Sequence, residues 1–347
     1  MDNKMKAVVK TQRGYNNIEL LDVDIPKCMD DEVLINVKAI GVCGTDYHIY
    51  TDEYDTVPPL IIGHEFSGVI AEVGKNVTNF NIGDRVISEL SVESCGTCRY
   101  CKTGNPQICL DKKAPGTHIN GIYAEYINMP ANLVHKLTDN ISFEEAAVIE
   151  PAAIVAHSFL QRTKIEPEDF VVVIGPGSIG LLAMQMAKIY GARKVAIIGM
   201  EADKKRLQIA EKLGCDYVIN ASEEDPLAII DKLTNGLGAD LVVECSGSAG
   251  GINSGINMLR KQGRMCVIGI PGPEKIQVEW KKAVIKALDL VCTFSSSPLS
   301  WNWVISMLDR KALDLNSLIS HKEPLEKWEY VFEETAKGNV VKAVLLP

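Results

Sequence analysis

The chain has 347 residues, of which 46% are hydrophobic and 23% charged, proportions typical of a globular protein large enough for two domains. Its formal net charge of −9 argues against the basic surface of a nucleic-acid-binding protein. The N-terminal MDNKMKAVVK lacks the apolar core of a signal peptide, and no apolar run is long enough to cross a membrane. We therefore expect a cytoplasmic protein with no membrane partner, whose ten cysteines are thiols or metal ligands.

Residues 1 to about 90 contain short apolar segments separated by Gly, Pro and Asn, which predicts a twisted antiparallel barrel or sandwich. In this region Cys43 is followed by the adjacent pair His64 and Glu65. Thiolate, imidazole and carboxylate are ligands of tetrahedral zinc, and an open fourth position makes such a site catalytic. The alternative is a buried cysteine with a solvated His-Glu pair. The metal site is favoured by surrounding glycines, which allow close backbone approach: Gly41, Gly44, Gly63, Gly68 and Gly74.

Four cysteines, Cys95, Cys98, Cys101 and Cys109, share one loop with the spacing C-x2-C-x2-C-x7-C. Closed four-cysteine zinc sites use short spacings because one loop can then wrap around a tetrahedron. Thiolates also bind iron–sulfur clusters, and a redox switch is a third alternative. We favour structural zinc, which would hold the loop together without performing chemistry.

Glu150 lies in an apolar helical run and precedes Pro151. Burial of an acid there would be unfavourable without a nearby cation. The alternative is a carboxylate at an exposed helix end.

From Asp169 onward, strands alternate with helices, which predicts a doubly wound parallel sheet. The apolar run Val171–Ile174 is typical of a strand buried on both faces. A G-x-G-x-x-G turn follows it and opens a helix, whose N-terminus would bind a dinucleotide pyrophosphate. The residues expected to bind the cofactor in this turn are Gly175, Gly177, Ser178, Ile179 and Gly180. The remaining cysteines, Cys28, Cys215, Cys245, Cys266 and Cys292, have no metal-like spacing and are interpreted as packing residues.

Gly199 stands where an acid normally binds the ribose 2′-hydroxyl. Its lack of a carboxylate would accommodate the 2′-phosphate of NADP, which Lys204, Lys205 and Arg206 could bind unless they are simply solvated helix charges. Glu201 could instead reach the ribose and favour NAD. Both cofactors remain open at this point.

The run G-H-E-x-x-G-x5-G from Gly63 to Gly74, taken with the four-cysteine loop and the dinucleotide turn, resembles the zinc-containing alcohol dehydrogenases of the medium-chain dehydrogenase/reductase superfamily. The resemblance covers nearly the whole chain and implies an α/β protein with two domains. A GroES-like β-barrel catalytic domain would occupy residues 1–155, with a structural zinc lobe at 93–112. A Rossmann domain would occupy 156–294, and residues 295–347 would return to the first domain. The resemblance also implies a homodimer or homotetramer.

This resemblance implies two zinc ions per chain, the catalytic one held by Cys43, His64 and Glu150. It identifies Glu150 with the ligand of the sorbitol and threonine dehydrogenase branch, bound directly or through water. Glu65 would be an intermittent ligand or a neighbour of the ligands. The zinc would acidify a substrate hydroxyl, and hydride would pass from the carbinol carbon to the nicotinamide.

Thr45 and His48, which both follow Cys43 closely in the sequence, complete the implied chemistry. Thr45 resembles the relay hydroxyl of the family, and His48 resembles the histidine that passes the proton to solvent through the cofactor ribose. The alternative for His48 is an ordinary surface histidine.

Glu150 fits the polyol and threonine branches better than simple-alcohol dehydrogenases, which have cysteine there. Threonine oxidation would require a cation near Phe294–Ser297, whereas the hydroxyls of this segment suit a polyol or a sugar-alcohol phosphate. We therefore predict a small-molecule polyol dehydrogenase, with L-threonine 3-dehydrogenase or a simple secondary-alcohol dehydrogenase as alternatives. An NADPH-binding structural or regulatory protein is a non-enzymatic alternative. Proteins of that kind lose ligand residues, whereas every candidate ligand is present here.

Overall fold

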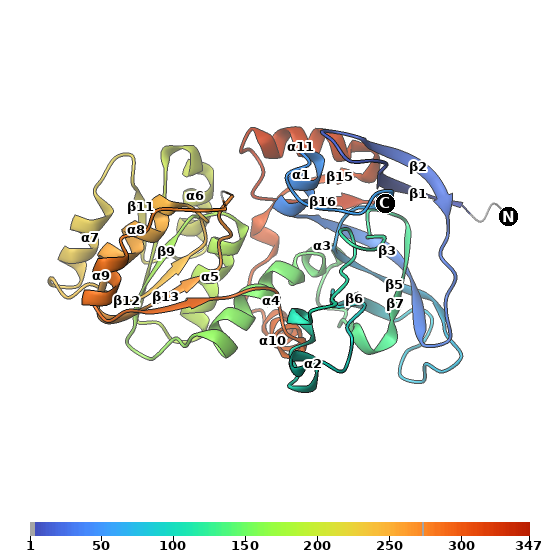
Figure 1. The fold of residues 1–347 in the computed structure, drawn as a ribbon, viewed down its shortest axis with the longest axis horizontal. Coiled ribbons are helices and arrows are strands. Elements are labelled where there is room, and N and C mark those ends of the chain that lie inside the picture. Colours follow the sequence, from blue (N-terminus) through green and yellow to red (C-terminus); the bar gives the residue numbers. More distant parts are fainter. Residues whose placement is uncertain (1–3, 273) are drawn as a thin grey trace. The chain divides into compact units, whose positions relative to one another are not determined.

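The computed structural model describes residues 4–272 and 274–347, which form two units (Figure 1). The first unit contains Met1–Glu150, Ser297–Asp309 and Ile319–Pro347, and the second contains Pro151–Ser296 and Arg310–Leu318. The chain thus changes unit after residues 150, 296, 309 and 318, whereas the sequence predicts boundaries after 155 and 294 only. Residues 310–318 of the predicted return segment belong to the second unit. Residues 1–3 of the predicted catalytic domain and Pro273 of the predicted Rossmann domain lie outside the described residues.

The first unit is built on two β-sheets. A seven-stranded sheet has the order β15-β16-β3-β5-β6-β8, with β7 also pairing with β3, and a three-stranded sheet has the order β2-β1-β4. All of these pairings are antiparallel except that of β15 with β16. The strands are β1 (Lys4–Lys10), β2 (Ile18–Asp24), β3 (Glu32–Val42), β4 (Leu60–Ile61), β5 (Glu65–Val73), β6 (Arg85–Ser88), β7 (Tyr126–Pro130), β8 (Val134–Lys136), β15 (Ile319–Pro324) and β16 (Lys342–Leu346).

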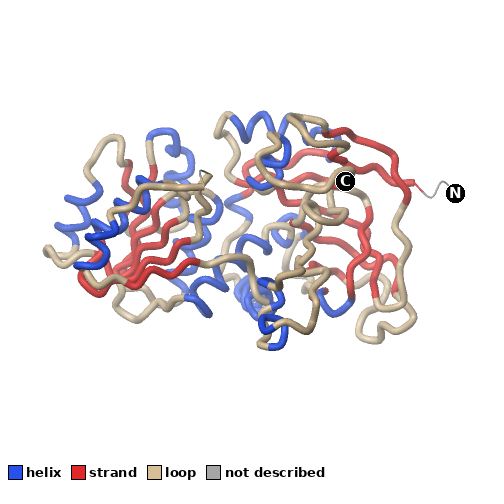
Figure 2. The backbone as a smooth tube through the Cα atoms, viewed as in Figure 1, coloured by secondary structure: helices blue, strands red, loops and turns tan. Residues whose placement is uncertain are grey.

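The helices of the first unit are short. They are α1 (Gly44–Tyr50), α2 (Arg99–Lys102), α3 (Phe143–Ala146), α10 (Pro298–Asp309) and α11 (Trp328–Ala336), and α4 (Ile149–His157) begins in this unit. Val33, Ile35 and Ile40 of β3 are fully buried in the main core, together with Val331 and Phe332 of α11. The segment 89–125 consists mainly of loops and turns (Figure 2).

The second unit is a six-stranded parallel sheet in the order β11-β10-β9-β12-β13-β14. Counted from its first strand this order is 3-2-1-4-5-6, which is the strand order of dinucleotide-binding folds. Its strands are β9 (Phe170–Ile174), β10 (Lys194–Gly199), β11 (Tyr217–Asn220), β12 (Ala239–Glu244), β13 (Leu259–Val267) and β14 (Asp289–Cys292). Its helices are α5 (Ser178–Ile189), α6 (Lys204–Lys212), α7 (Pro226–Leu233), α8 (Ala249–Met258) and α9 (Trp280–Ile285), with a π-helical turn at Ser158–Arg162.

Helix α5 packs on β9 and β10, and α6 packs on α5, β10 and β11 (Figure 1). In a second group, α8 packs on β12 and β13 and is contacted by α7 and α9. Right-handed crossovers place two such groups on opposite faces of the sheet. Every residue of β9 is therefore covered on both sides and buried. The doubly wound parallel sheet predicted from the sequence is confirmed.

The isolated cysteines differ in their surroundings. Cys266 is buried in β13, whereas Cys28, Cys215 and Cys245 are half-buried. Cys292 is exposed at the end of the edge strand β14, so its interpretation as a packing residue is wrong. An edge strand has one neighbour instead of two, and its side chains are therefore less covered.

Candidate metal centres and dinucleotide site

The backbone around Gly63 places the His-Glu pair. Gly63 has a φ of +89°, and a Cβ at this position would collide with the ring of the fully buried Tyr123. Only glycine meets both conditions without strain. The turn delivers His64 and Glu65 to the start of β5, where Glu65 pairs with Gly41 of β3. Because Cys43 follows the end of β3, this register brings the cysteine close to the His-Glu pair.

Cys43, His64 and Glu65 converge in the structure. The Cys43 sulfur, a His64 ring nitrogen and a Glu65 carboxylate oxygen all lie within 4.8 Å of one another. Glu65 is buried, and the other two side chains are half-buried. One sulfur, one nitrogen and one oxygen donor around a partly accessible point match the donor set of a catalytic zinc site.

Asp46 lies behind His64 and was not singled out from the sequence. Its buried carboxylate accepts hydrogen bonds through Oδ2 from the Cys43 N–H at 2.9 Å and from the Tyr123 hydroxyl at 2.9 Å. Its Oδ1 lies 3.6 Å from His64 Nδ1. Burial lowers the pKa of His64, but the negative charge of Asp46 and the Cys43 thiolate outweigh burial and raise this pKa well above its ordinary value. A carboxylate facing Nδ1 leaves Nε2 as the nitrogen available to an ion.

Lys342 is a second residue that was not identified from the sequence. It lies at the start of β16, and its side chain is 3% exposed. Its Nζ is 2.6 Å from Oε1 and 2.5 Å from Oε2 of Glu65, whose side chain is fully buried. Burial lowers the pKa of Lys342, but the Glu65 carboxylate raises it by more, so the ammonium form is favoured. The signal in the sequence is a lysine within the otherwise apolar run VVKAVLLP.

Glu150 is buried in the first turn of α4, so the alternative of an exposed helix-end carboxylate is wrong. Burial raises the pKa of Glu150 to about 7, and the charges of His64, Lys342 and Lys112 partly oppose this rise. The neighbouring cations of the protein therefore compensate only in part for the burial of this carboxylate. Glu150 is not part of the close group formed by Cys43, His64 and Glu65, and its assignment as a zinc ligand stays a prediction.

The two expected relay residues lie on α1, directly after Cys43. Thr45 is half-buried, with its Oγ1 3.6 Å from the Cys43 sulfur. His48 is exposed, and its Nδ1 lies 2.6 Å from Oε2 of Glu53. An ion-paired surface position matches both the relay role and the alternative of an ordinary surface histidine.

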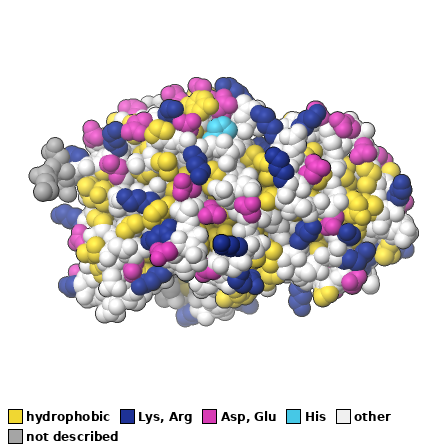
Figure 3. All heavy atoms as spheres, turned by 180° about the vertical axis from the view of Figure 1, so that it is seen from behind, with side chains coloured by type: hydrophobic (Ala, Val, Ile, Leu, Met, Phe, Trp, Pro, Cys, Tyr) yellow, Lys and Arg dark blue, Asp and Glu magenta, His cyan; other side chains and the backbone are white. Residues whose placement is uncertain are grey.

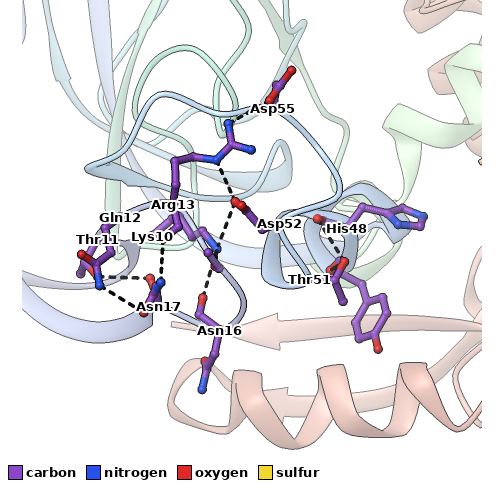
Figure 4. Close-up of polar contacts among 12 residues, drawn as sticks. Lys10, Thr11, Gln12, Arg13, Asn16, Asn17, His48, Thr51, Asp52 and Asp55 are labelled. Atoms are coloured by element: carbon purple, nitrogen blue, oxygen red, sulfur yellow. Dashed lines mark hydrogen bonds and ion pairs between the residues drawn. The ribbon is translucent and has the colours of Figure 1, made fainter. Parts of the chain in front are cut away.

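The C-terminal end of α1 is fixed by the loop between β1 and β2 (Figure 4). The Asp52 carboxylate lies 2.8 Å from Nε of Arg13. The fully buried side chain of Lys10 donates to the carbonyl oxygens of Gly14 at 2.5 Å and Asn16 at 3.2 Å. The ring of His48 extends away from this cluster (Figure 4). The loop thereby anchors the helix that carries Thr45 and Asp46.

The four cysteines of the loop form a compact cluster. The sulfur of Cys109 lies 3.5 Å from that of Cys95 and 3.9 Å from that of Cys98. A tetrahedron with Zn–S bonds of about 2.3 Å has edges of about 3.8 Å, whereas a disulfide would require about 2.05 Å. The backbone N–H of Cys98 donates to the Cys95 sulfur and, with Thr97, lowers the pKa of Cys95 to about 6, while burial raises that of Cys101 to about 12. The spacing suits one ion, since an iron–sulfur cluster holds its cysteine sulfurs farther apart.

In the turn between β9 and α5, the surroundings of each glycine explain why a larger residue is absent. A Cβ at Gly175 would lie 2.9 Å from the Ser246 backbone nitrogen, and one at Gly180 would collide with the Gly175 carbonyl oxygen. A Cβ at Gly177, which caps α5, would meet no atom within 4 Å. The first and third glycines therefore permit close packing, and the second leaves the helix N-terminus open to a phosphate. Ser178 and Ile179 form the first turn of α5.

The structure supplies a packing reason for the glycine at the end of β10. A Cβ at Gly199 would lie 2.7 Å from Cγ of Pro176 in the glycine turn. Glu201 follows as an exposed carboxylate that accepts hydrogen bonds from Asn220 Nδ2 at 2.7 Å and from Lys204 Nζ at 3.3 Å. These two donors lower the pKa of Glu201 and keep it ionised. The glycine at position 199 therefore has a packing reason, and the choice between NAD and NADP stays a prediction.

The other basic residues near this position are also engaged. Arg206 forms an ion pair with Asp203 at 2.8 Å, within the same part of the chain. Lys205 has polar contacts of its own. Binding of a 2′-phosphate would therefore require existing contacts of Lys204 and Arg206 to be broken.

Residues 29–139 match the alcohol dehydrogenase GroES-like domain, and residues 178–310 match the zinc-binding dehydrogenase family. The sequence is 34% identical over 346 residues to a D-arabitol-phosphate dehydrogenase from Enterococcus avium (99% of this chain, 98% of the relative) and 37% identical over 343 residues to a sorbitol dehydrogenase from Halalkalibacterium halodurans (99% of each). It is 37% identical over 352 residues to an L-threonine 3-dehydrogenase from Bacillus velezensis (100% of each).

A crystal structure of a zinc-binding dehydrogenase from Sinorhizobium meliloti 1021 bound to NADP is similar, with a TM-score of 0.91 and 27% identity over 99% of each chain. The predicted fold class, a GroES-like domain with a Rossmann domain, is confirmed by these matches together with the two observed sheets. The chain therefore belongs to the zinc-binding dehydrogenases of the alcohol dehydrogenase superfamily, as its motifs predict.

Proposed function

We propose that this chain is a zinc- and NAD-dependent dehydrogenase that oxidises a secondary hydroxyl of a sugar alcohol or of a sugar-alcohol phosphate. The observation that carries the proposal is the convergence of Cys43, His64 and Glu65, with Asp46 orienting the imidazole. A zinc ion bound there would supply the positive charge that acidifies the substrate hydroxyl, while the nicotinamide accepts hydride. Two zinc ions per chain are proposed, the second held by the four-cysteine cluster.

Cys43 and His64 are the proposed constant ligands, Glu65 is an intermittent ligand, and Glu150 completes the acidic side of the site. The burial of Glu150 and its electrostatic interaction with His64 support this placement. A zinc-loaded crystal structure would decide between a direct Glu150–zinc bond and a bridging water. Direct coordination requires a Glu150 oxygen about 2.0–2.2 Å from the ion.

The proposed route for the substrate proton starts at the Thr45 hydroxyl and ends at His48. Thr45 Oγ1 lies next to the Cys43 sulfur, while the His48 ring is in contact with solvent and paired with Glu53. A hydroxyl can accept one proton as it donates another, and an imidazole can exchange protons with water near neutral pH. His48→Gln should therefore slow turnover at low pH more than at high pH, because hydroxide can replace the lost relay.

NAD is the proposed cofactor because Glu201 is the first acidic side chain after β10, and its carboxylate is exposed and held ionised. An ionised carboxylate binds the ribose 2′-hydroxyl and repels a 2′-phosphate. We expect kcat/KM to favour NAD over NADP at least tenfold, which corresponds to about 1.4 kcal/mol. Glu201→Ala should reduce this ratio, whereas Glu223→Ala, another acidic side chain of the same unit, should leave it unchanged. Strict use of NADP by the unaltered enzyme would contradict the assignment.

The substrate class rests on two observations. Relatives named for D-arabitol phosphate and sorbitol cover nearly the whole chain. The segment Phe294–Ser297 carries hydroxyls and no cation that would pair with an amino-acid carboxylate. L-Threonine is the second candidate, because a relative of equal identity is named for it.

One activity screen tests both the substrate and the cofactor. Sugar alcohols, sugar-alcohol phosphates, L-threonine and simple secondary alcohols are each supplied with NAD and with NADP, and reduced nicotinamide is followed by absorbance. The proposal predicts the highest kcat/KM for a polyol or its phosphate with NAD. A clear preference for L-threonine would replace the polyol assignment and retain the reaction class. Fewer than two zinc ions per chain, together with no turnover of any alcohol, would favour the NADPH-binding structural or regulatory alternative.

Two further expectations stay proposals. The chain is expected to form a homodimer or homotetramer, which light scattering on the purified protein would test. The expected partner is a small-molecule alcohol. No nucleic-acid partner is expected, because the formal net charge is −9. Acidic and basic side chains are interspersed on the face drawn in Figure 3. No helix in the described part of the chain is long and apolar enough to span a membrane.

A further inference from the structure

The first unit contains a cavity of about 600 Å³ that is separate from the two candidate metal sites. Its walls come from β1, β2, β4 and β7 and from the loops at residues 92–93 and 115–121. None of the candidate zinc ligands, all of which the structure describes, lines this cavity. Cavities that bury small ligands have volumes of about 300–1,000 Å³, so this one has room for a ligand of its own.

Much of the cavity lining is aliphatic. Removal of such apolar surface from water is favourable, so a ligand with a hydrocarbon body would be stabilised here. Five of the aliphatic lining side chains are at most 6% exposed: Met5, Val9, Ile61, Ile127 and Met129.

Glu32, at the start of β3, contributes a half-buried carboxylate to the same cavity. Its Oε2 accepts hydrogen bonds from Asn128 Nδ2 at 2.7 Å and from the Met29 N–H at 3.2 Å. Both donors are neutral, and no lysine, arginine or histidine in the described part of the chain forms an ion pair with Glu32. A partly buried carboxylate without a cation is incompletely compensated. The charge of Glu32 therefore favours a ligand that carries a cationic group.

The two other carboxylates that line the cavity are already paired. Asp24 lies 2.8 Å from Nζ of Lys4, and Glu93 lies 2.5 Å from Nζ of Lys113, and at least half of each of these four side chains is exposed. Exposed pairs of this kind leave little net charge to attract a ligand. Among the described residues, the three carboxylates form no close group of metal ligands, so an organic cation suits the cavity better than a metal ion.

We propose that this cavity binds a small amphipathic ammonium compound, with its hydrocarbon body against the aliphatic lining and its ammonium group on Glu32. A carboxylate offers about four acceptor positions, so the ammonium can donate to Glu32 while Asn128 and the Met29 N–H keep their hydrogen bonds. A hydrogen bond between two charged groups is stronger than one between neutral groups. The site is independent of the proposed zinc chemistry, because it shares no lining residue with the candidate metal ligands.

The test is isothermal titration calorimetry of the full-length, zinc-loaded protein with hexylammonium near neutral pH. Hexanoate has a chain of the same length with the opposite charge, and ethylammonium has the same charge with a short chain. Each should bind at least about tenfold more weakly than hexylammonium. Equal affinity for hexanoate would contradict the role of Glu32, and equal affinity for ethylammonium would contradict the role of the aliphatic lining. Absence of hexylammonium binding at millimolar concentration would refute the site as a whole.

Two pairs of variants locate the bound ligand. Glu32→Gln should weaken hexylammonium binding about tenfold, the scale of one hydrogen bond to a charged group, whereas Glu19→Gln, at an exposed position of β2 outside the cavity, should leave it unchanged. Val23→Trp should fill part of the cavity and weaken binding, whereas Leu21→Trp, on the same strand but outside the cavity, should not. The Val23 and Leu21 pair still decides if Glu32→Gln fails to fold.

Two other outcomes would overturn the inference. Native affinity in both Glu32→Gln and Val23→Trp would place the ligand elsewhere on the protein. Tighter binding of a capped apolar peptide with a central lysine, acetyl-Leu-Lys-Leu-amide, than of hexylammonium would replace the small molecule with a protein partner. Neither result depends on alcohol oxidation, so failure of this inference leaves the proposed function untouched.

Discussion

Asp46→Asn should separate metal affinity from folding. Aspartate and asparagine side chains have nearly the same size, so the substitution changes only the charge and the hydrogen bonding at this position. Oδ2 of Asp46 accepts from the Cys43 N–H and the Tyr123 hydroxyl, both at 2.9 Å. An asparagine must place its carbonyl oxygen there, and its NH₂ group then faces His64 Nδ1, where Oδ1 now lies at 3.6 Å.

The consequence for His64 follows from the tautomers of imidazole. A carboxylate favours a proton on Nδ1 and a free electron pair on Nε2, whereas a facing NH₂ group favours the reverse. We expect zinc affinity at the Cys43–His64 site to fall about 10- to 100-fold, or about 1.4–2.8 kcal/mol. Two hydrogen bonds to a charged acceptor become bonds to a neutral one, which costs about 1 kcal/mol each. Burial raises the pKa of Asp46, so removal of its charge offsets part of that loss.

The measurement is zinc content after dialysis against a series of chelator-buffered zinc solutions, with unfolding followed in parallel. Asp46→Asn should retain about one zinc ion per chain, in the four-cysteine site, where the native enzyme retains about two. Its melting temperature should fall by only a few degrees. Asp52→Asn makes the same chemical change at the other end of α1, where the carboxylate contacts Arg13, and should leave zinc content unchanged. Native zinc affinity in Asp46→Asn would refute the assigned role.

Three further predictions concern stability and the second metal site. Gly63→Ala should lower the free energy of unfolding in urea by about 3 kcal/mol, because the new methyl group overpacks against Tyr123 and the φ is strained. Gly83→Ala, at a φ of +94° with open space around it, should show only the smaller strain effect. Equal losses in the two variants would disprove the packing argument. Cys98→Ser should lower zinc content from about two to about one per chain while Co²⁺ still enters the Cys43 site, and retention of both ions would contradict a four-cysteine ligand set. Burial raises the pKa of Asp216, but hydrogen bonds from Lys194 and the Val195 N–H lower it by more, so the folded pKa lies below the ordinary value. The carboxylate therefore stabilises the fold above its unfolded pKa of about 3.9. This stabilisation is lost as the pH falls through the lower folded pKa. The stability difference between native protein and Asp216→Asn should therefore be largest near neutral pH and vanish in acid, and a constant difference between pH 7 and 2 would contradict this assignment.

The features that the sequence determined are those formed by residues close together in the chain. The four cysteines close within one loop, and the G-x-G-x-x-G turn joins a buried strand to the helix directly after it, so spacing alone predicts both. Cys43 and the His-Glu pair are farther apart, but their glycine context and the strand pattern between them restrict how the segment can fold. The alternating apolar runs predict the parallel sheet for the same reason, because the apolar pattern within each strand or helix indicates which of its faces is buried.

Tertiary structure alone decided which distant side chains meet those local motifs. Lys342 reaches Glu65 across 277 positions, and Tyr123 reaches Asp46 across 77, because the register of β16 on β3 and the fold of the loop over Gly63 bring them together. From the sequence Gly199 is noted only for lacking an acid, whereas the structure shows that a Cβ there would lie 2.7 Å from Cγ of Pro176 and would force a neighbouring atom to shift. Burial and strand register depend on the whole chain, and the charge partners of a buried metal site are fixed only when the chain has folded.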